Sequence, residues 1–180
     1  ITKGLETSGN GAEFTSTDYY SSFDSDGFTI AAGAAGTGNG SSQTAVHWCW
    51  KAGGTAVSNG NGSITSSVSA NAAAGFSIVT YTGTGSNATV GHGLSSAPKW
   101  IITKARTPSG RSWGVFHSNI SNANNLYLDG TDVESSGGTF WNSTSPTSTV
   151  FSVGTAGDSN GSGYTMVAYC FAEVKGYSKF

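Results

Sequence analysis

The sequence carries little charge and has no basic cluster. Lysine, arginine, aspartate and glutamate together make up 10% of its 180 residues, against about 25% in ordinary soluble domains. The formal net charge is −2. Because phosphate binding needs several cations on one face, this composition argues against a nucleic-acid partner.

Long apolar runs and closely spaced cysteines are also missing. No run approaches the roughly 18 residues of a membrane-spanning helix, so we expect no membrane insertion. The chain begins at Ile1 without a methionine or a signal-peptide pattern, so we expect a piece or processed product of a longer polypeptide. Cys49 and Cys170 lie far apart in apolar segments, which favours buried free thiols. A disulfide remains open if the two segments approach each other.

Glycine and aromatic residues are what the chain has in quantity. It contains 27 glycines, five tryptophans and seven tyrosines, and this aromatic content argues against a disordered linker. Apolar side chains alternate along short segments, as where Phe76, Ile78 and Thr80 share one face of an extended chain. Turn signals separate these segments, and no helical period is sustained. The sequence therefore predicts an all-β fold, an antiparallel β-sandwich of jelly-roll or lectin-like type, with short strands and Gly/Ser/Asn-rich turns.

Residues 44–53, TAVHWCWKAG, give the clearest prediction of a central strand. Val46, Trp48 and Trp50 share one large aromatic face, and smaller residues share the other. A Gly/Asn/Ser-rich loop, 33–42, precedes this segment. Residues 54–74 are almost all small, and we interpret them as a connection or an irregular edge strand.

An internal repeat organises the chain. Residues 27–54 align with residues 150–176, at separations of 151 − 28 = 123 and 170 − 49 = 121. The matched positions are Phe28 with Phe151, Trp48 with Tyr169, Cys49 with Cys170, and Trp50 with Phe171. The repeat predicts that residues 1–58 are the C-terminal part of a preceding unit and that residues 59–180 are one complete unit.

Three residues are candidates for ligand contact. His92 lies between Gly91 and Gly93, where it could touch a receptor or hydrogen-bond the backbone of a turn. Trp113 and His117 share a strand face and could form a platform for stacking a sugar ring, or could belong to the core. Trp141 and Tyr127, nearer to turns, are further candidates for contact.

Metal and catalytic motifs are absent from the sequence. The spacing of His47, His92 and His117 does not form a metal pair on one strand or helix. Asp24 and Asp26 imitate the start of a calcium loop, but the later glutamate ligand is missing, so a capped turn is the better interpretation. No nucleophile elbow, phosphate loop, dinucleotide fingerprint or paired carboxylate occurs. We expect no enzymatic activity, no cofactor and no metal.

Several strings together carry a family resemblance. They are WKAGGTAVSNGNGSITSSVSANAAAGFSIVTYTGTGSNATVGHGLSSAPKWIITKAR, SWGVFHSNI, FWNSTSPTSTVFSVGTA and YTMVAYCFAEVKGYSKF. In this order they resemble a repeated β-rich domain of unknown function from virion structural proteins of marine tailed bacteriophages, proteins similar to tail-fibre or appendage components. The resemblance covers roughly residues 27–180 and implies a β-sandwich in an extracellular virion. It supplies no activity.

The functional expectation combines this resemblance with the composition. Low charge and strands that are apolar on two faces favour burial against neighbouring subunits, so we expect a homo-oligomer, with a trimer as the first expectation. The predicted function is a virion module of a tail fibre, appendage or capsid decoration that works by assembly and host-surface recognition. Its expected partners are its own copies, other virion proteins and a host-surface glycan. The alternative is a carbohydrate-binding module of a secreted adhesin or polysaccharide-degrading enzyme.

Overall fold

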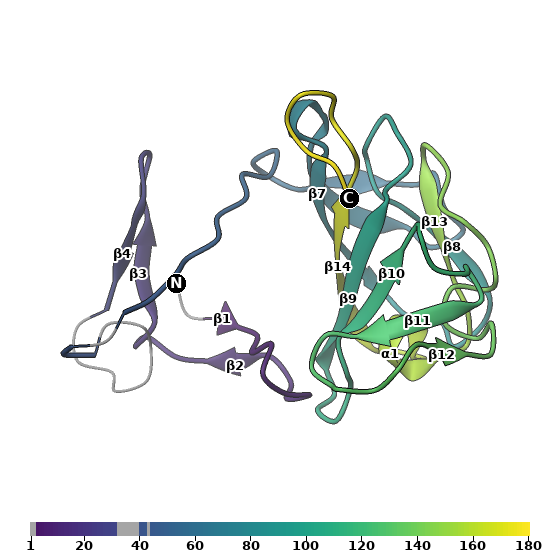
Figure 1. Cartoon of the computed structure of the whole chain (residues 1–180), viewed down its shortest axis with the longest axis horizontal. Helices are drawn as coiled ribbons and strands as arrows, with labels where there is room; N and C mark the ends of the chain where they lie inside the picture. The colour runs from purple at the N-terminus through teal and green to yellow at the C-terminus, as the bar shows by residue number, and fades with distance from the viewer. Residues whose placement is uncertain (1–2, 32–39, 43) are drawn as a thin grey trace.

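The computed structural model describes residues 3–31, 40–42 and 44–180 of the chain (Figure 1). The predicted loop 33–42 lies mostly outside the described residues. The N-terminal region contains β1 (Lys3–Gly4), β2 (Phe14–Thr15), β3 (Tyr20–Phe23) and β4 (Phe28–Ile30). The remaining strands are β5 (Val57–Asn59), β6 (Ser66–Asn71), β7 (Phe76–Thr82), β8 (Ala88–Gly91), β9 (Trp100–Thr107), β10 (Gly114–His117), β11 (Asn124–Tyr127), β12 (Ser135–Ser136), β13 (Val150–Val153) and β14 (Thr165–Phe171). Two short helices complete the described elements, the 3-10 helix η1 (Ala72–Ala74) and α1 (Gly157–Asn160).

Residues 57–180 form a sandwich of two antiparallel layers. The large layer is an eight-stranded sheet with the order β12-β11-β10-β9-β14-β7-β6-β5, and β8 pairs with β13 in the second layer. The last strand of the chain, β14, lies in the middle of the large sheet between β7 and β9. The predicted all-β antiparallel sandwich is confirmed.

The inner core lies between the two layers. Val79 and Tyr81 of β7, Phe151 of β13 and Met166 of β14 belong to one buried cluster. The alternation predicted for β7 is confirmed, since Phe76 belongs to a second cluster on the opposite face of the sheet. The central strands β7, β9 and β14 bury side chains on both faces of the large sheet.

The N-terminal region stands beside the sandwich rather than within it (Figure 1). The β3–β4 hairpin lies away from the large sheet, and residues 44–56 run from it toward β5. The first strand of the sandwich, β5, begins at Val57. The division of the chain into repeat units at residues 58 and 59 stays a prediction.

The central strand predicted at residues 44–53 is wrong for this chain. Among the described residues, none pairs with this segment as a strand, and Trp48 keeps 74% of its surface exposed. A strand needs neighbours that accept its backbone hydrogen bonds, and the edge of the large sheet is already occupied by β5 and β6. Cys49 is consequently exposed, contrary to expectation, while Cys170 is a buried free thiol.

The small-residue stretch 54–74 contains both β5 and β6. β5 is an edge strand of three residues, as the interpretation of an irregular edge allowed, but β6 is an interior strand paired on both sides. Val68 supplies the buried apolar contact in β6. The buried Ser66 hydroxyl is satisfied by donating to the Gly91 carbonyl oxygen at 2.8 Å.

Candidate interaction surface

The face of the large sheet turned away from β8 and β13 carries the second buried apolar cluster of the molecule. We call it the outer face, and its residues are Phe76, Ile78, Trp100, Ile102, Trp113, Val115, Leu126, Tyr169 and Phe171. The register aligns these side chains in rows across the strands. In one row Phe171 lies between Phe76 and Trp100, with ring centroids 4.9 Å and 4.7 Å apart.

One end of the outer face is covered by residues 3–15, which we call the N-terminal arm. Leu5 packs against the outer face, and the Trp113 indole Nε1–H donates to the Glu6 carbonyl oxygen at 2.8 Å. The backbone N–H of Glu13 donates to the carbonyl oxygen of Arg106 in β9 at 2.8 Å. The arm is therefore attached to the sheet by both apolar and backbone contacts.

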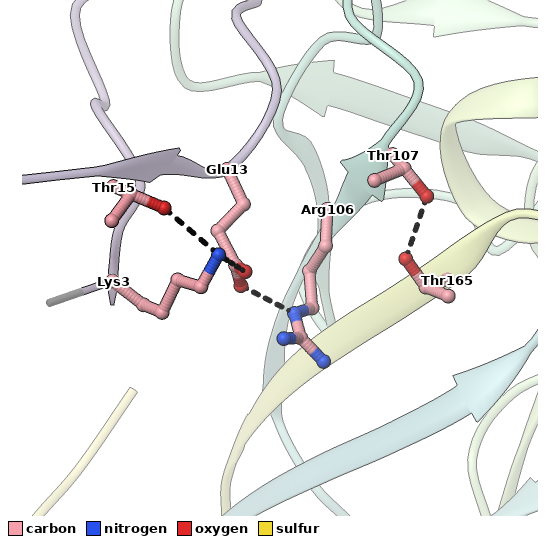
Figure 2. Close-up of polar contacts among 6 residues, drawn as sticks. All are labelled: Lys3, Glu13, Thr15, Arg106, Thr107 and Thr165. Carbon is pink, nitrogen blue, oxygen red and sulfur yellow. Dashed lines mark hydrogen bonds and ion pairs between the residues drawn. The ribbon is translucent and has the colours of Figure 1, made fainter.

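An ion pair adds to this attachment (Figure 2). Arg106 Nε donates to Glu13 Oε2 at 2.7 Å, and Lys3 Nζ lies 3.5 Å from the other carboxylate oxygen. Lys3 also donates to the Thr15 hydroxyl across the β1–β2 pair. The hydrogen bond from Arg106 is the main cause that holds the pKa of Glu13 below its ordinary value, and the charges of Arg106 and Lys3 act in the same direction.

The other end of the outer face is covered by residues 50–52 and by the C-terminus. The Trp50 ring lies 5.6 Å from Phe171, and Phe180 lies 5.8 Å from Trp100. The Asn71 side chain donates to the Lys51 carbonyl oxygen at 3.1 Å. Gly53 packs so closely on β6 that a Cβ there would meet the Ala70 carbonyl oxygen. Close backbone approach thus fixes the chain immediately after Trp50.

Just ahead of this anchor, an aromatic row extends into solvent. We use the name aromatic row for Val46, Trp48 and Trp50, whose exposed fractions are 81%, 74% and 46%. The rings of Trp48 and Trp50 are 6.1 Å apart. Trp50 also contacts Phe171 of the outer face, so the row joins that buried cluster to three exposed apolar side chains.

The structure gives His92 a place in the interior. Its ring is fully buried at the layer formed by β8 and β13. The Leu94 N–H donates to Nδ1, so Nε2 carries the proton and donates to the Thr147 carbonyl oxygen, both at 3.1 Å. Burial is the main cause that lowers the pKa of His92. This placement suits the backbone-bonding interpretation and gives no support to ligand contact.

Trp113 and His117 lie on the outer face, on the same side of β10 as Val115. Trp113 is only 4% exposed, so its ring is not free to stack on a sugar. His117 is half-buried and lies opposite Trp100 in the register, with its Nδ1 accepting from the Asn119 N–H. The structure therefore brings these two residues onto one face and leaves His92 on the other side of the sheet.

Two further aromatic candidates belong to the interior. Trp141 is 1% exposed and packs against Phe116 and Phe140 in the inner core. Tyr127 packs against the same core, with its ring 6.2 Å from that of Phe140. Their nearness to turns had suggested a surface contact, but their positions in the core do not suit one.

A buried lysine beside Trp113 was not singled out from the sequence. Lys104 is fully buried on β9, where Nζ donates to the Arg111 carbonyl oxygen and lies 5.9 Å from the Trp113 ring centroid. Burial lowers the pKa of Lys104, and the charges of Asp129 and Asp158 oppose this shift. The sequence did contain a signal for this burial, because alternation along WIITKAR places Lys104 on the same face as Trp100 and Ile102.

The acidic turn and the remaining polar groups show structural roles. Asp24 accepts a hydrogen bond from the Thr29 hydroxyl, and its N–H donates to the Gly27 carbonyl oxygen. These contacts describe the predicted capped turn. Within the described parts of the chain, no group of three histidine, cysteine, aspartate or glutamate side chains could hold a metal ion. Among the same residues, no helix is long and apolar enough to cross a membrane.

Comparison with known proteins places the chain in a family without an assigned activity. No curated protein and no solved structure matches it. One family model, described as a domain of unknown function (DUF7483), matches residues 1–180. The chain therefore belongs to the family of this domain, DUF7483.

Proposed function

We propose that this chain is a structural module of a bacteriophage virion that works by assembly through the aromatic row. The observation that carries the proposal is the row itself, because Trp48 exposes 74% of its surface and joins the ring cluster of the outer face through Trp50. Exposed aromatic surface of this kind is typical of protein interfaces. In this proposal the row supports self-association into a homo-oligomer, and the trimer stays the first expectation.

The virion setting rests on the sequence resemblance described above. A chain of low charge that carries an exposed apolar edge suits a particle in which neighbouring subunits bury that edge. In this proposal other virion proteins are further partners, and the exposed polar loops are available to recognise a host surface. The module has no catalytic role.

Carbohydrate binding is the second candidate, and Trp48 is the observation that favours it. A solvent-exposed indole offers an apolar ring face on which a sugar can stack. In this version the module belongs to a secreted adhesin or a polysaccharide-degrading enzyme. Trp48 and Trp50 take the role that the sequence had suggested for Trp113 and His117.

Light scattering over a concentration series tests the proposal. We expect the chain to self-associate, and we expect the double variant Trp48→Ser, Trp50→Ser to shift it toward monomer. The control is Val133→Ser, which removes an exposed apolar side chain, 87% exposed, from a distant loop. A monomeric chain that binds sugars on a glycan array would overturn assembly in favour of carbohydrate binding.

A further inference from the structure

We propose that residues 44–51 are the closing strand of a second sandwich of the same fold, and that the partner of the aromatic row is another copy of the repeat unit. In that sandwich the segment would lie between strands equivalent to β7 and β9, as β14 does in this structure. This inference concerns the same surface as the proposed function and goes beyond it, because the partner is a repeat unit of the same polypeptide and not a second chain. Three structural observations support it.

The first observation is a hairpin that occurs twice in one register. β1 pairs with β2 through Lys3 with Thr15 and Gly4 with Phe14. β11 pairs with β12 through Asn124 with Ser136 and Asn125 with Ser135. Adding 121 to each residue number of the first hairpin gives the second, and 170 − 49 = 121 is also the separation of the two cysteines. The repeat therefore extends to the beginning of the N-terminal arm.

The second observation is a small aromatic cluster in the N-terminal region. The Phe28 ring lies 5.4 Å from that of Tyr20 and 4.8 Å from that of His47, and the Tyr20 hydroxyl is 3.1 Å from His47 Nδ1. At a separation of 121 residues Tyr20 aligns with Trp141 and His47 with Ala168, and Phe28 aligns with Phe151 at a separation of 123. All three aligned residues belong to the inner core of the sandwich. The cluster thus brings together three residues whose aligned counterparts all lie in one buried core.

The third observation is the division of faces along residues 44–50. In β14, Met166, Ala168 and Cys170 face the inner core, whereas Tyr169 and Phe171 face outward. The same parity puts Cys49 inward in the second sandwich and Trp48 and Trp50 outward. A segment with this pattern has the faces of a central strand but, among the described residues, has no neighbouring strands to bury it.

The elements that are missing can be named from this correspondence. The N-terminal region supplies the equivalents of β11, β12 and β13 in β1, β2 and β4, and it supplies the equivalent of β14 in residues 44–50. The equivalents of β5 to β10 are what a partner has to provide. In the chain, β11 to β14 follow β5 to β10. We therefore infer that the partner is a copy of the unit that precedes the N-terminal arm in the same polypeptide.

The experiment adds these strands and measures the reactivity of Cys49. Residues 57–121 are joined directly ahead of Ile1 of the full chain, which continues the repeat in register because 1 + 121 = 122. The probe is the thiol reagent DTNB at neutral pH and low protein concentration. In the chain itself Cys49 is exposed and should react at once, whereas the buried Cys170 should react only after unfolding.

In the extended protein we expect Cys49 to become protected, reacting at least about 100-fold more slowly than in the chain itself. The matched variant is Ala45→Asp, which places a carboxylate at the position aligned with the fully buried Met166. It should restore the reactivity of Cys49 in the extended protein and leave the reactivity of the chain itself unchanged.

Continued rapid reaction of Cys49 in the extended protein would overturn the inference, whether or not the added residues fold. Protection that the Ala45→Asp variant fails to remove would overturn it as well. Both outcomes are distinct from failure of the proposed function, which is decided by association between chains. The chain could self-associate through the aromatic row while Cys49 stays reactive in the extended protein. That result would support the proposed function and contradict this inference.

Discussion

The sandwich and the N-terminal region carry related strand sequences in opposite environments. Cys170 is fully buried in the centre of the large sheet, whereas the aligned Cys49 is exposed. Phe171 is buried between two aromatic neighbours, while the aligned Trp50 keeps 46% of its surface exposed. The difference lies in the neighbours: an alternating apolar segment becomes a strand only where other strands complete its hydrogen bonds and cover its faces.

The largest loss of stability should come from truncating an aromatic side chain in the inner core of the sandwich. Phe151→Ala removes a fully buried side chain from the inner core and should lower the free energy of unfolding by about 3–5 kcal/mol. The aligned Phe28→Ala changes a half-buried residue and should cost about 1 kcal/mol. Urea unfolding followed by circular dichroism measures both. Equal losses would contradict the comparison.

A smaller loss is expected from the buried histidine of the sandwich. His92→Leu leaves the Leu94 N–H and the Thr147 carbonyl oxygen without their partner, which should cost about 1–3 kcal/mol at neutral pH. His47→Leu, in the N-terminal region, is the matched control and should cost less. Urea unfolding of the two variants at pH 8 measures the difference.

The same histidine should make the sandwich sensitive to acid. The pKa of His92 is lowered in the folded state, so the unfolded state binds more protons below the ordinary pKa of 6.5. Stability should therefore fall as the pH drops from 6.5 toward the lower folded value, and His92→Leu should flatten this dependence. An unchanged pH profile in the variant would assign the acid sensitivity to other groups.

The attachment of the N-terminal arm should respond more weakly. Glu13→Gln removes the ion pair with Arg106, a partly exposed contact, and should weaken docking of the arm by about 0.5 kcal/mol. The pKa of Glu13 is depressed in the docked state, so its contribution is present above the ordinary value of 4.5 and is lost as the pH falls through the depressed value. Proteolysis of the arm against pH measures this, and a profile shared by wild type and variant would contradict it.

The smallest change in stability should come from the aromatic row itself. Among the described residues, no strand lies beside the segment that carries Trp48, and its side chain is exposed. The free energy of unfolding of Trp48→Ser should therefore stay within about 0.5 kcal/mol of wild type. The aligned Tyr169→Ser, which removes a ring packed against Trp113, should cost more. Thermal unfolding of both variants tests this. A large loss for Trp48→Ser would show that the row is already buried by a partner.

The sequence was informative about faces and parity. Alternation assigned Phe76 and Ile78 to one face of β7 and Val79 and Tyr81 to the other, and the structure agrees. The same rule correctly grouped Trp113 with His117. It failed for the environment of residues 44–53, because parity states which side chains share a face but leaves open whether anything covers that face.

The candidate site was harder to predict than the fold. The sequence left His92 open to receptor contact or to a backbone hydrogen bond, and its ring hydrogen-bonds the Thr147 carbonyl oxygen, 55 residues away. The exposed position of Trp48 and the burial of Lys104 likewise depend on contacts between distant segments. Local sequence does not encode which distant backbone will approach.

Composition and alternation by themselves determined that this chain builds antiparallel strands with two-sided packing, because a strand's faces follow from its period of two. The tertiary structure decided which of the two repeated segments is buried. β14 has β7 and β9 beside it, while among the described residues the segment 44–50 has no such neighbours. The physical reason is that backbone hydrogen bonds and apolar burial are satisfied between segments, so one pattern can end in a core or at a surface according to what lies next to it.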